Sequence, residues 1–455
     1  MRVGIVGGGI AGLAAAHEVL LQGGTPIVFE SDERVGGKLR TESFDGIDID
    51  TGPDSFLARR PEAVQLCREL GLDGGLEPPA ATSAFVFARG ALRRLPAGLI
   101  LGVPTDPLAL ARSGILSPWG AARAAAEPFV PGAALGDDDA LGAVIRRRYG
   151  DEVASRLVDP LLGGINAGDV DTLSIDTVAP QIAAAARADR SLTRALKRAP
   201  APPPDGHRPA GQATSNDPVF LTVPGGLAQL VDALVASIVE RGGEIRTGDA
   251  VSGISATSIT SRSGTTDVQG VVLAAPAYVT APLVEPLAPG AAGILSTIPY
   301  ASVAMTLLAY DDARDLDASG FLVPKTEGLL MTAASWASSK WAHLARPGRI
   351  LLRVSAGRHG DERAMGMDDD DLVAHMRADL ATTMDMRGEP AAARVIRWPR
   401  SFPQYPPGHA ARIAAAVAAL PAGVALAGAA LGGVGIPACI GSGRAAARTV
   451  LARSG

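Results

Sequence analysis

A short glycine-rich motif near the N-terminus constrains this chain more than any other feature. Gly7, Gly9 and Gly12 form Gly-x-Gly-x-x-Gly between an apolar, β-branched run at 3–6 and a run with helical apolar spacing at 11–21. A second apolar run at 26–29 ends at Glu30. The order strand, glycine turn, helix, strand predicts a βαβ unit in a parallel sheet, with a dinucleotide pyrophosphate at the helix N-terminus.

Each residue type in this motif has a physical use. Gly7 permits the tight turn, Gly9 lets the backbone approach a pyrophosphate, and Gly12 lets the helix pack on the strand. Glu30 can accept hydrogen bonds from a ribose hydroxyl. The alternative is a chance turn in a chain that contains 54 glycines. The strand, the helix and the acid that surround the motif argue against that alternative.

Composition excludes several classes of protein. The 455 residues are 47% hydrophobic and 20% charged, which is typical of a large globular chain and not of a disordered one. The net charge of -5 gives no overall attraction to nucleic acid. Two cysteines without metal-ligand spacing predict neither a disulfide framework nor a metal site. Together with the absence of an export signal and of a transmembrane segment, this pattern favours a cytoplasmic protein.

The residues after Glu30 separate flavin from nicotinamide dinucleotides. Arg34, Gly36, Gly37 and Lys38 resemble the second glycine motif of the flavin amine oxidase superfamily, in which backbone and basic side chains complete the grip on FAD. NAD enzymes of the ordinary doubly wound type do not usually carry this motif. The resemblance therefore implies FAD as the cofactor.

Four later segments resemble the porphyrinogen oxidases, the protoporphyrinogen and coproporphyrinogen oxidases of haem synthesis. They are GPDSF at 52–56, PLLGGINAGD at 160–169, RW at 397–398 with PQY at 403–405, and GVGIPACI at 433–440. The segments lie in order and span nearly the whole chain. The chain is identified as a member of the porphyrinogen oxidase family, within the flavin amine oxidase superfamily.

This resemblance implies an α/β fold. We expect an FAD-binding Rossmann-like domain of the glutathione-reductase type, with an inserted mixed-sheet substrate domain and a helical insertion. The FAD-binding domain is expected at 1–57, 219–295 and 393–455, the substrate-binding domain at 58–104 and 296–392, and the helical insertion at 105–198. The proline-rich stretch 199–218 has no hydrophobic periodicity, which predicts a flexible loop.

The resemblance also assigns site residues. The implied FAD contacts are Gly7, Gly8, Gly9, Ile10, Ala11, Gly12, Glu30, Ser31, Arg34, Gly37, Lys38, Gly52, Pro53, Asp54, Ser55, Val251, Trp398, Ala429, Val434, Gly435 and Ile436. Among them Trp398 is expected against the flavin. A helix predicted to begin at Gly441 would present its N-terminus to the ring. The implied porphyrinogen contacts are Arg59, Arg60, Gly164, Asn166 and Met305.

A porphyrinogen is a large apolar macrocycle with carboxylate arms, so its site needs apolar walls and cations at the rim. Arg60, with Arg59 beside it, resembles the basic position near the propionates in members that act on coproporphyrinogen. Gly164 resembles the position beside the reacting methylene bridge, where a larger side chain would block approach. Family members often carry an aromatic residue where Asn166 stands. Ala84 stands where human-type protoporphyrinogen enzymes carry an arginine, which favours coproporphyrinogen III.

The chemistry implied by the resemblance is centred on the flavin. We assign no catalytic side chain and no metal ligand, because the six histidines have no triad or metal spacing. The expected reaction is the six-electron oxidation of coproporphyrinogen III to coproporphyrin III by dioxygen, with three hydrogen peroxide formed. A protoporphyrinogen IX oxidase is the alternative, and an amine oxidase or a non-catalytic FAD-binding scaffold is a more distant one. A ferrochelatase that takes over the product is a further partner that the family implies. Membrane-bound members contact the membrane through the helical insertion, so a peripheral contact is open here too, but Arg146 to Arg148 and the acidic run 137–139 favour a solvated surface and a soluble protein.

Overall fold

The computed structural model describes residues 1–130, 135–198 and 218–452. The chain divides into two compact units. Residues 1–78, 218–298 and 410–452 form the first unit, and residues 79–198 and 299–409 form the second. The loop predicted at 199–218 lies outside the described residues, apart from residue 218.

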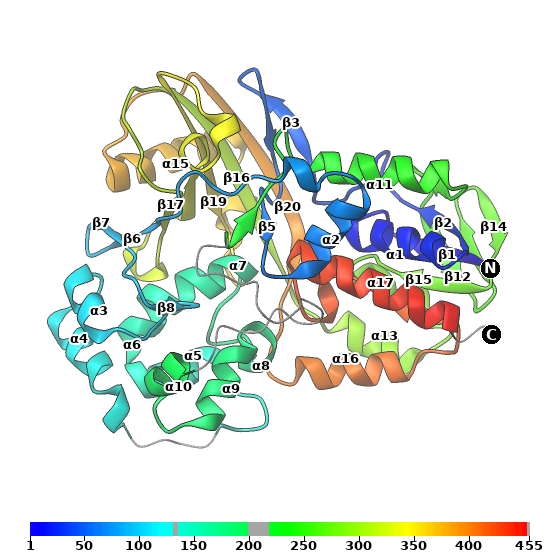
Figure 1. Cartoon of the computed structure of the whole chain (residues 1–455), viewed down its shortest axis with the longest axis horizontal. Coiled ribbons are helices and arrows are strands. Elements are labelled where there is room, and N and C mark those ends of the chain that lie inside the picture. Colours follow the sequence, from blue (N-terminus) through cyan, green and yellow to red (C-terminus); the bar gives the residue numbers. More distant parts are fainter. Residues whose placement is uncertain (131–134, 199–217, 453–455) are drawn as a thin grey trace. The chain divides into compact units, whose positions relative to one another are not determined.

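The first unit is built on a parallel sheet in the order β11-β2-β1-β15-β21 (Figure 1). Its strands are β1 (Arg2–Val6), β2 (Thr25–Phe29), β11 (Glu244–Arg246), β15 (Gly270–Leu273) and β21 (Val424–Leu426). Val3 and Ile5 share a buried core with Leu13 of helix α1 (Ile10–Leu21). Gly4 faces the opposite side, where a Cβ atom would lie 2.3 Å from Cδ1 of Ile259. Both faces of the sheet are therefore covered, which explains its continuous apolar strands.

Helices and short strands complete this unit. Its other helices are α2 (Pro61–Glu69), α11 (Ala228–Glu240), α12 (Ala277–Val284), α13 (Pro289–Ser296), α16 (His409–Ala418) and α17 (Ile436–Ala452), with 3-10 turns η1 (Asp73–Gly75) and η7 (Ala429–Leu431). The short strands are β3 (Thr41–Phe44), β4 (Ile47–Asp50), β5 (Phe56–Leu57), β10 (Phe220–Leu221) and the antiparallel meander β12 (Val251–Ile254), β13 (Ser258–Ser261) and β14 (Gly264–Asp267). The meander supplies Ile259, so it covers the sheet face opposite to α1.

The second unit contains a mixed sheet in the order β20-β16-β19-β18-β17-β6-β7. Its strands are β6 (Phe85–Ala88), β7 (Ala91–Arg94), β16 (Tyr300–Asp311), β17 (Gly320–Leu322), β18 (Met331–Trp336), β19 (Arg349–Ala356) and β20 (Ala392–Pro403). Only the β17–β6 pair among these neighbours is parallel. Helix α15 (Asp369–Met384) packs on the sheet through Leu372, Met376 and Leu380.

A helical segment of the second unit follows the β8 (Leu99–Ile100) and β9 (Val103–Pro104) hairpin. Its helices are α3 (Pro107–Ser113), α4 (Pro118–Ala125), α5 (Leu141–Tyr149), α6 (Asp151–Val153), α7 (Gly164–Asn166), α8 (Ile175–Val178), α9 (Pro180–Ala188) and α10 (Leu192–Arg198), with the 3-10 turn η2 (Glu127–Phe129) and the π-helix η3 (Ala154–Gly163). Short helical turns η4 (Lys325–Glu327), α14 (Ala337–Lys340), η5 (Ala342–Leu344) and η6 (Arg363–Met365) connect the sheet strands. Buried Leu, Val and Ala side chains of the segment form a core of their own.

The α/β architecture predicted from the sequence is confirmed: a parallel nucleotide-type sheet, a mixed sheet and a helical segment are all present. The start predicted for the last helix is wrong. Helix α17 begins at Ile436, five residues before Gly441. Pro437 does not interrupt it, because the N–H that proline lacks has no helical partner in the first turn of a helix.

Candidate functional site: a dinucleotide cradle and a substrate wall

The three motif glycines between β1 and α1 each have a different environment. Gly7 has a φ of 104°, a left-handed conformation that glycine adopts without strain. A Cβ atom on Gly12 would lie 1.9 Å from the carbonyl oxygen of Gly7, so only glycine fits there. Gly9 precedes α1 with a φ of -70°, and a Cβ atom there would meet no atom within 4 Å. Gly9 thus faces open space at an N-terminus that no side chain caps.

Glu30 ties the second strand to this turn. Its Oε2 accepts a hydrogen bond from the backbone N–H of Gly8 at 2.7 Å, and its Oε1 accepts from the N–H of Asp32 at 3.0 Å and from the Ser31 hydroxyl at 3.1 Å. The carboxylate therefore lies directly beside the glycine loop, on the residue that follows β2. This is the place that the sequence predicts for a group that binds ribose.

The second glycine segment closes over the first. The Gly36 N–H donates to the Gly8 carbonyl at 2.8 Å, and Gly36 and Gly37 have φ values of 100° and 56°. Arg34 donates to the carbonyl oxygens of Val35 and Gly37, at 3.0 and 2.8 Å. Desolvation lowers the pKa of Arg34. Arg34 therefore shapes the loop through its own hydrogen bonds.

Lys38 and Gly52 lie against each other. A Cβ atom on Gly52 would lie 1.9 Å from the Lys38 carbonyl oxygen, so the GPDSF segment packs on the second glycine loop. The Lys38 side chain is exposed, yet surrounding protein lowers its pKa by desolvation, and the thiol of Cys439 opposes that shift weakly. Ser55 donates to Asp54 at 3.0 Å, and Pro53 is half-buried beside them.

The C-terminal segment reaches the same region through α17. Ala429 lies in η7, Val434 and Gly435 immediately precede α17, and Ile436 is its first residue. A Cβ atom on Gly443 would lie 2.0 Å from the carbonyl oxygen of Ala11, so α17 crosses α1 in close contact. This contact brings the C-terminal motif to the helix that carries the first glycine motif.

Other implied residues of the first unit lie at its surface or in its core. Ile10 and Ala11 are buried at the start of α1. Val251 is half-buried as the first residue of β12, where it pairs with Ser261. Arg59 and Arg60 are exposed immediately before α2. Cys439 is buried and burial raises the pKa of its thiol to about 11, so it is an uncharged packing residue and not a nucleophile.

The remaining implied residues, Gly164, Asn166, Met305 and Trp398, belong to the second unit. Met305 is buried on β16, and Trp398 is half-buried on β20, where it pairs with Val303. Gly164 has a φ of -61°, is exposed, and a Cβ atom there would meet nothing within 4 Å. Asn166 is buried, and its amide donates to the Leu162 carbonyl at 2.8 Å.

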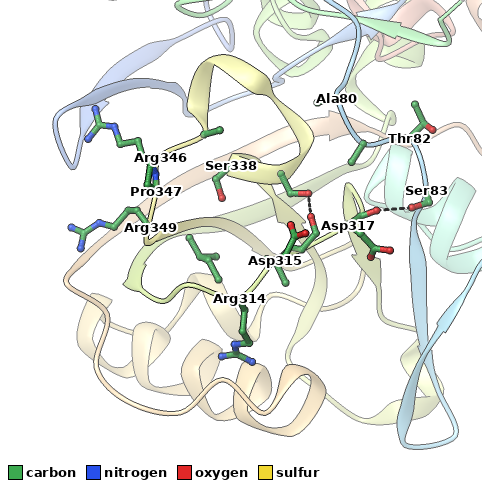
Figure 2. Close-up of a pocket in the computed structure, with 15 residues that line it drawn as sticks. Ala80, Thr82, Ser83, Arg314, Asp315, Asp317, Ser338, Arg346, Pro347 and Arg349 are labelled. Carbon is green, nitrogen blue, oxygen red and sulfur yellow. Dashed lines mark hydrogen bonds between the residues drawn. The ribbon is translucent and has the colours of Figure 1, made fainter.

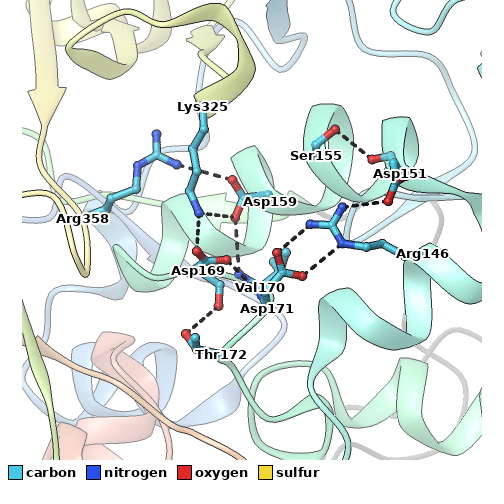
Figure 3. A network of polar contacts seen from close by, with 10 residues as sticks. All are labelled: Arg146, Asp151, Ser155, Asp159, Asp169, Val170, Asp171, Thr172, Lys325 and Arg358. Atoms are coloured by element: carbon cyan, nitrogen blue, oxygen red, sulfur yellow. Dashed lines mark hydrogen bonds and ion pairs between the residues drawn. The ribbon is translucent and has the colours of Figure 1, made fainter.

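The structure draws attention to residues that the sequence analysis did not assign to the site individually. Gln404 donates to the backbone carbonyl of Asn166 at 3.0 Å, so the PQY segment supports the PLLGGINAGD segment. Ile165 is 52% exposed beside Gly164. Figure 3 shows that Lys325 and Arg358 meet Asp159 on the π-helix η3. The contacts of Gln404 with Asn166, and of Lys325 and Arg358 with Asp159, leave little signal in the sequence, because the partners come from segments far apart in the chain.

A cavity of about 700 Å³ in the second unit is separate from these residues (Figure 2). It is lined by residues 80–83, 314–317, 338–339, 345–347 and 349–350, and no implied site residue lies among them. Figure 2 shows the guanidinium groups of Arg346 and Arg349 turned away from Thr82 and Ser83. The cavity therefore does not present a converging set of cations to a carboxylate ligand.

The described residues contain no group of three or more His, Cys, Asp or Glu side chains arranged to hold a metal ion. None of the helices among residues 1–130, 135–198 and 218–452 is long and apolar enough to cross a bilayer.

Comparisons with known proteins agree with this geometry. Residues 10–451 match the family of flavin containing amine oxidoreductases. The chain is 35% identical to the coproporphyrinogen III oxidase of Bacillus subtilis, over 99% of this chain and 98% of that protein. It is 29% identical to the protoporphyrinogen oxidase of Bos taurus, over 98% of each chain. It superposes on a crystal structure from Exiguobacterium, described as that of a protoporphyrinogen oxidase, with a TM-score of 0.86 and 29% identity over 99% and 98% of the two chains.

Proposed function

Because this chain belongs to the family of flavin containing amine oxidoreductases, we propose that it is an FAD-dependent coproporphyrinogen III oxidase. The reaction removes six electrons and six protons from coproporphyrinogen III and gives coproporphyrin III. Three dioxygen molecules accept them and become three hydrogen peroxide. The observation that carries the substrate assignment is the 35% identity, over 99% of the chain, to an enzyme named for that activity.

The residues of the first unit fit FAD. Gly9 leaves open the space that a pyrophosphate needs at an uncapped helix N-terminus, and the Glu30 carboxylate lies beside it. Gly7 to Gly12 would hold the pyrophosphate, Glu30 and Ser31 the ribose, and Lys38 would add a cation. Gly52 to Ser55, Val251, Ala429 and Val434 to Ile436 complete the implied set. When bound, FAD supplies the capacity to accept a hydride from a carbon atom of the substrate.

The protein's own task is to bind and orient the macrocycle. The exposed Arg59 and Arg60 would pair with propionates. Gly164 would leave room for a methylene bridge of the substrate, since a Cβ atom on this residue would meet nothing within 4 Å. Met305 and Trp398 are the other contacts that we carry over from the family resemblance. No described side chain is assigned a proton-transfer role.

The test is a comparison of two substrates in air. Purified, flavin-loaded protein receives coproporphyrinogen III or protoporphyrinogen IX, and porphyrin fluorescence is followed against an autoxidation blank. Faster oxidation of coproporphyrinogen III supports the proposal, and Arg60→Ala should then slow it. Faster oxidation of protoporphyrinogen IX would favour the alternative substrate. No porphyrin from either one would exclude both oxidases and leave an amine oxidase or a non-catalytic scaffold.

We further propose that the protein acts in the cytoplasm and touches a membrane peripherally. The exposed face of α4 and η2 is apolar: Pro118, Trp119, Ala122, Ala126 and Phe129 follow helical spacing along it. Trp119 is 81% and Phe129 is 88% exposed, values that are unusual for such large apolar side chains. Transfer of the porphyrin to a ferrochelatase remains a prediction from the family resemblance.

A further inference from the structure

A buried ion pair joins helices α2 and α17 of the first unit. The Arg444 guanidinium on α17 donates two hydrogen bonds to the carboxylate of Glu69, the last residue of α2. One runs from Nη1 to Oε1 at 3.1 Å, and the other from Nη2 to Oε2 at 2.5 Å. The Arg444 side chain is 8% exposed and that of Glu69 is 25% exposed. A two-pronged pair that is mostly shielded from water holds its partners in one geometry.

A buried histidine of α1 lies against this pair. His17 Nε2 is 3.3 Å from Oε2 of Glu69, and His17 Nδ1 is 3.4 Å from the hydroxyl of Ser237 on α11. Burial lowers the pKa of His17, so the ring is neutral at pH 7 and adds no second cation. Desolvation raises the pKa of Glu69, but the hydrogen bonds and the charge of Arg444 outweigh it, so that this pKa is lowered. At neutral pH, Glu69 is therefore a carboxylate that faces Arg444.

The rest of α2 is held on α17 by packing. The buried face of α2 shares a hydrophobic core with Ile436 and Ile440 in the first half of α17. Near the start of α2, a Cβ atom on Gly441 would lie 3.4 Å from Cγ of Glu62. Oε2 of Glu62 is buried and has no hydrogen-bond partner among the described residues. Packing of this kind lets a helix roll or slide on its neighbour, whereas the forked hydrogen bonds at Glu69 oppose both movements.

The other end of α2 carries the two cations that we assign to the substrate. Arg60 is the residue directly before α2, Arg59 precedes it, and both are exposed. Pro61 is the first residue of the helix, and no described side chain caps this end. Because Arg60 is joined directly to the first turn, any roll or slide of α2 moves the Arg60 backbone with it.

We propose that Glu69 and Arg444 are positioning residues for substrate binding: by fixing α2 on α17, they set where Arg60 stands relative to the flavin-side residues 434–436. This inference rests on the proposed function and deepens it. Glu69 lies nine residues after Arg60, about 13 Å along the helix, so it acts through α2 and not by contact with the substrate. Charged hydrogen bonds need distances of about 2.7–2.9 Å, so a shift of roughly 1 Å at Arg60 is enough to lose one.

The experiment compares Arg444→Met and Glu69→Gln with a matched control in the flavin-loaded protein. Arg448→Met is the control, because Arg448 lies one turn further along α17 and pairs with the buried carboxylate of Glu18 on α1 at 3.4 Å, without touching α2. Arg444→Lys keeps the cation but loses the fork of donors. Each substitution is made in the wild-type chain and together with Arg60→Ala. The readouts are KM and kcat with coproporphyrinogen III, and thermal unfolding and flavin content report folding.

We expect Arg444→Met and Glu69→Gln to raise KM about fivefold, with kcat and flavin content little changed, because a displaced cation weakens binding. Arg444→Lys should give a KM between those of wild type and Arg444→Met. Together with Arg60→Ala, the same substitutions should change KM by less than about twofold, because the side chain that α2 positions is gone. Arg448→Met should lower the melting temperature and leave KM unchanged.

Full additivity with Arg60→Ala would overturn the inference, because the pair would then act on binding independently of Arg60. An unchanged KM in Glu69→Gln would also overturn it, and this variant folds even if Arg444→Met does not, since Gln keeps one acceptor oxygen on a partly exposed side chain. So would an equal rise of KM in Arg448→Met, or an unchanged KM in Arg60→Ala, and all four results leave the oxidase assignment intact. A wild-type protein that oxidises no porphyrinogen would overturn the proposed function and this inference together.

Discussion

Two adjacent glycines at the end of the π-helix η3, Gly163 and Gly164, allow a test of which one the fold requires and which one the reaction requires. Gly163 and Gly164 both have right-handed helical backbones, with φ values of -61°. A Cβ atom on Gly163 would lie 2.9 Å from Oδ1 of Asp159 and 3.1 Å from the Gly168 carbonyl. A Cβ atom on Gly164 would meet nothing. Alanine should therefore harm the fold at the first position and the reaction at the second.

The magnitudes follow from these contacts. Replacing a helical glycine with alanine stabilises by roughly 0.5–1 kcal/mol, and this gain is common to both variants. Gly163→Ala also pays an overpacking cost of about 1–3 kcal/mol. Gly164→Ala should thus unfold later than Gly163→Ala, by about 2–4 °C for each kcal/mol of that difference in a domain of this size. Relative to wild type, Gly164→Ala should be slightly more stable.

The order is reversed for catalysis. If the ring approaches Gly164 closely, the added methyl group costs a similar 1–3 kcal/mol in the bound state, or about 5- to 150-fold in kcat/KM. The assays are thermal unfolding of both flavin-loaded variants and porphyrin formation from coproporphyrinogen III. Wild-type kcat/KM in Gly164→Ala would refute the placement of Gly164 beside the substrate. Equal melting temperatures of the two variants would refute the steric reasoning.

Three further predictions concern other parts of the chain. Gly9→Ala should fold with wild-type thermal stability but lose FAD, whereas Gly12→Ala should lose stability as well, because its Cβ atom would lie 1.9 Å from a carbonyl oxygen. Flavin absorbance and thermal unfolding check both variants. Flavin retention in Gly9→Ala would contradict the placement of the FAD pyrophosphate at Gly9. Burial lowers the pKa of His17 below its ordinary 6.5. As the pH falls below 6.5, His17 is therefore protonated in the unfolded chain before it is protonated in the folded one. Stability should be complete above pH 6.5 and fall as the pH drops below it, and urea midpoints at pH 7.5 and 5 should differ less in His17→Gln. Wild-type protein should sediment with lipid vesicles and Trp119→Ser should not, while Val417→Ser, an exposed control on α16, should behave as wild type.

The first βαβ unit could be predicted because its determinants are local. Glycines at fixed offsets, a buried strand and an acid at the next strand end all lie within 30 residues. The start of α17 was missed because glycine and proline at 435 and 437 resemble a loop, although proline is favourable in the first turn of a helix. The local sequence pattern therefore predicted that a helix lies here, but not the residue at which it begins.

The conformation of the turn at Gly164 and Ile165 could not be predicted for two physical reasons. A π-helix takes more residues per turn than an α-helix, so it rotates the faces that follow and turns Asn166 inward and Ile165 outward. Its supports, Lys325, Arg358 and Gln404, come from the turns beyond three separate strands of the sheet. No periodicity connects residues so far apart in the chain.

Gly9 and Gly164 share a property that links the two sites. Each has a negative φ and open space where its side chain would be, so the fold does not require glycine at either position. Open space alone does not mark a site, because Gly290 and Gly293 on the surface of α13 have it too. What distinguishes Gly9 and Gly164 is that their open space coincides with motifs that imply a ligand. When the fold does not require a glycine, and the glycine lies in a motif that implies a ligand, the best explanation for it is the space that the ligand needs.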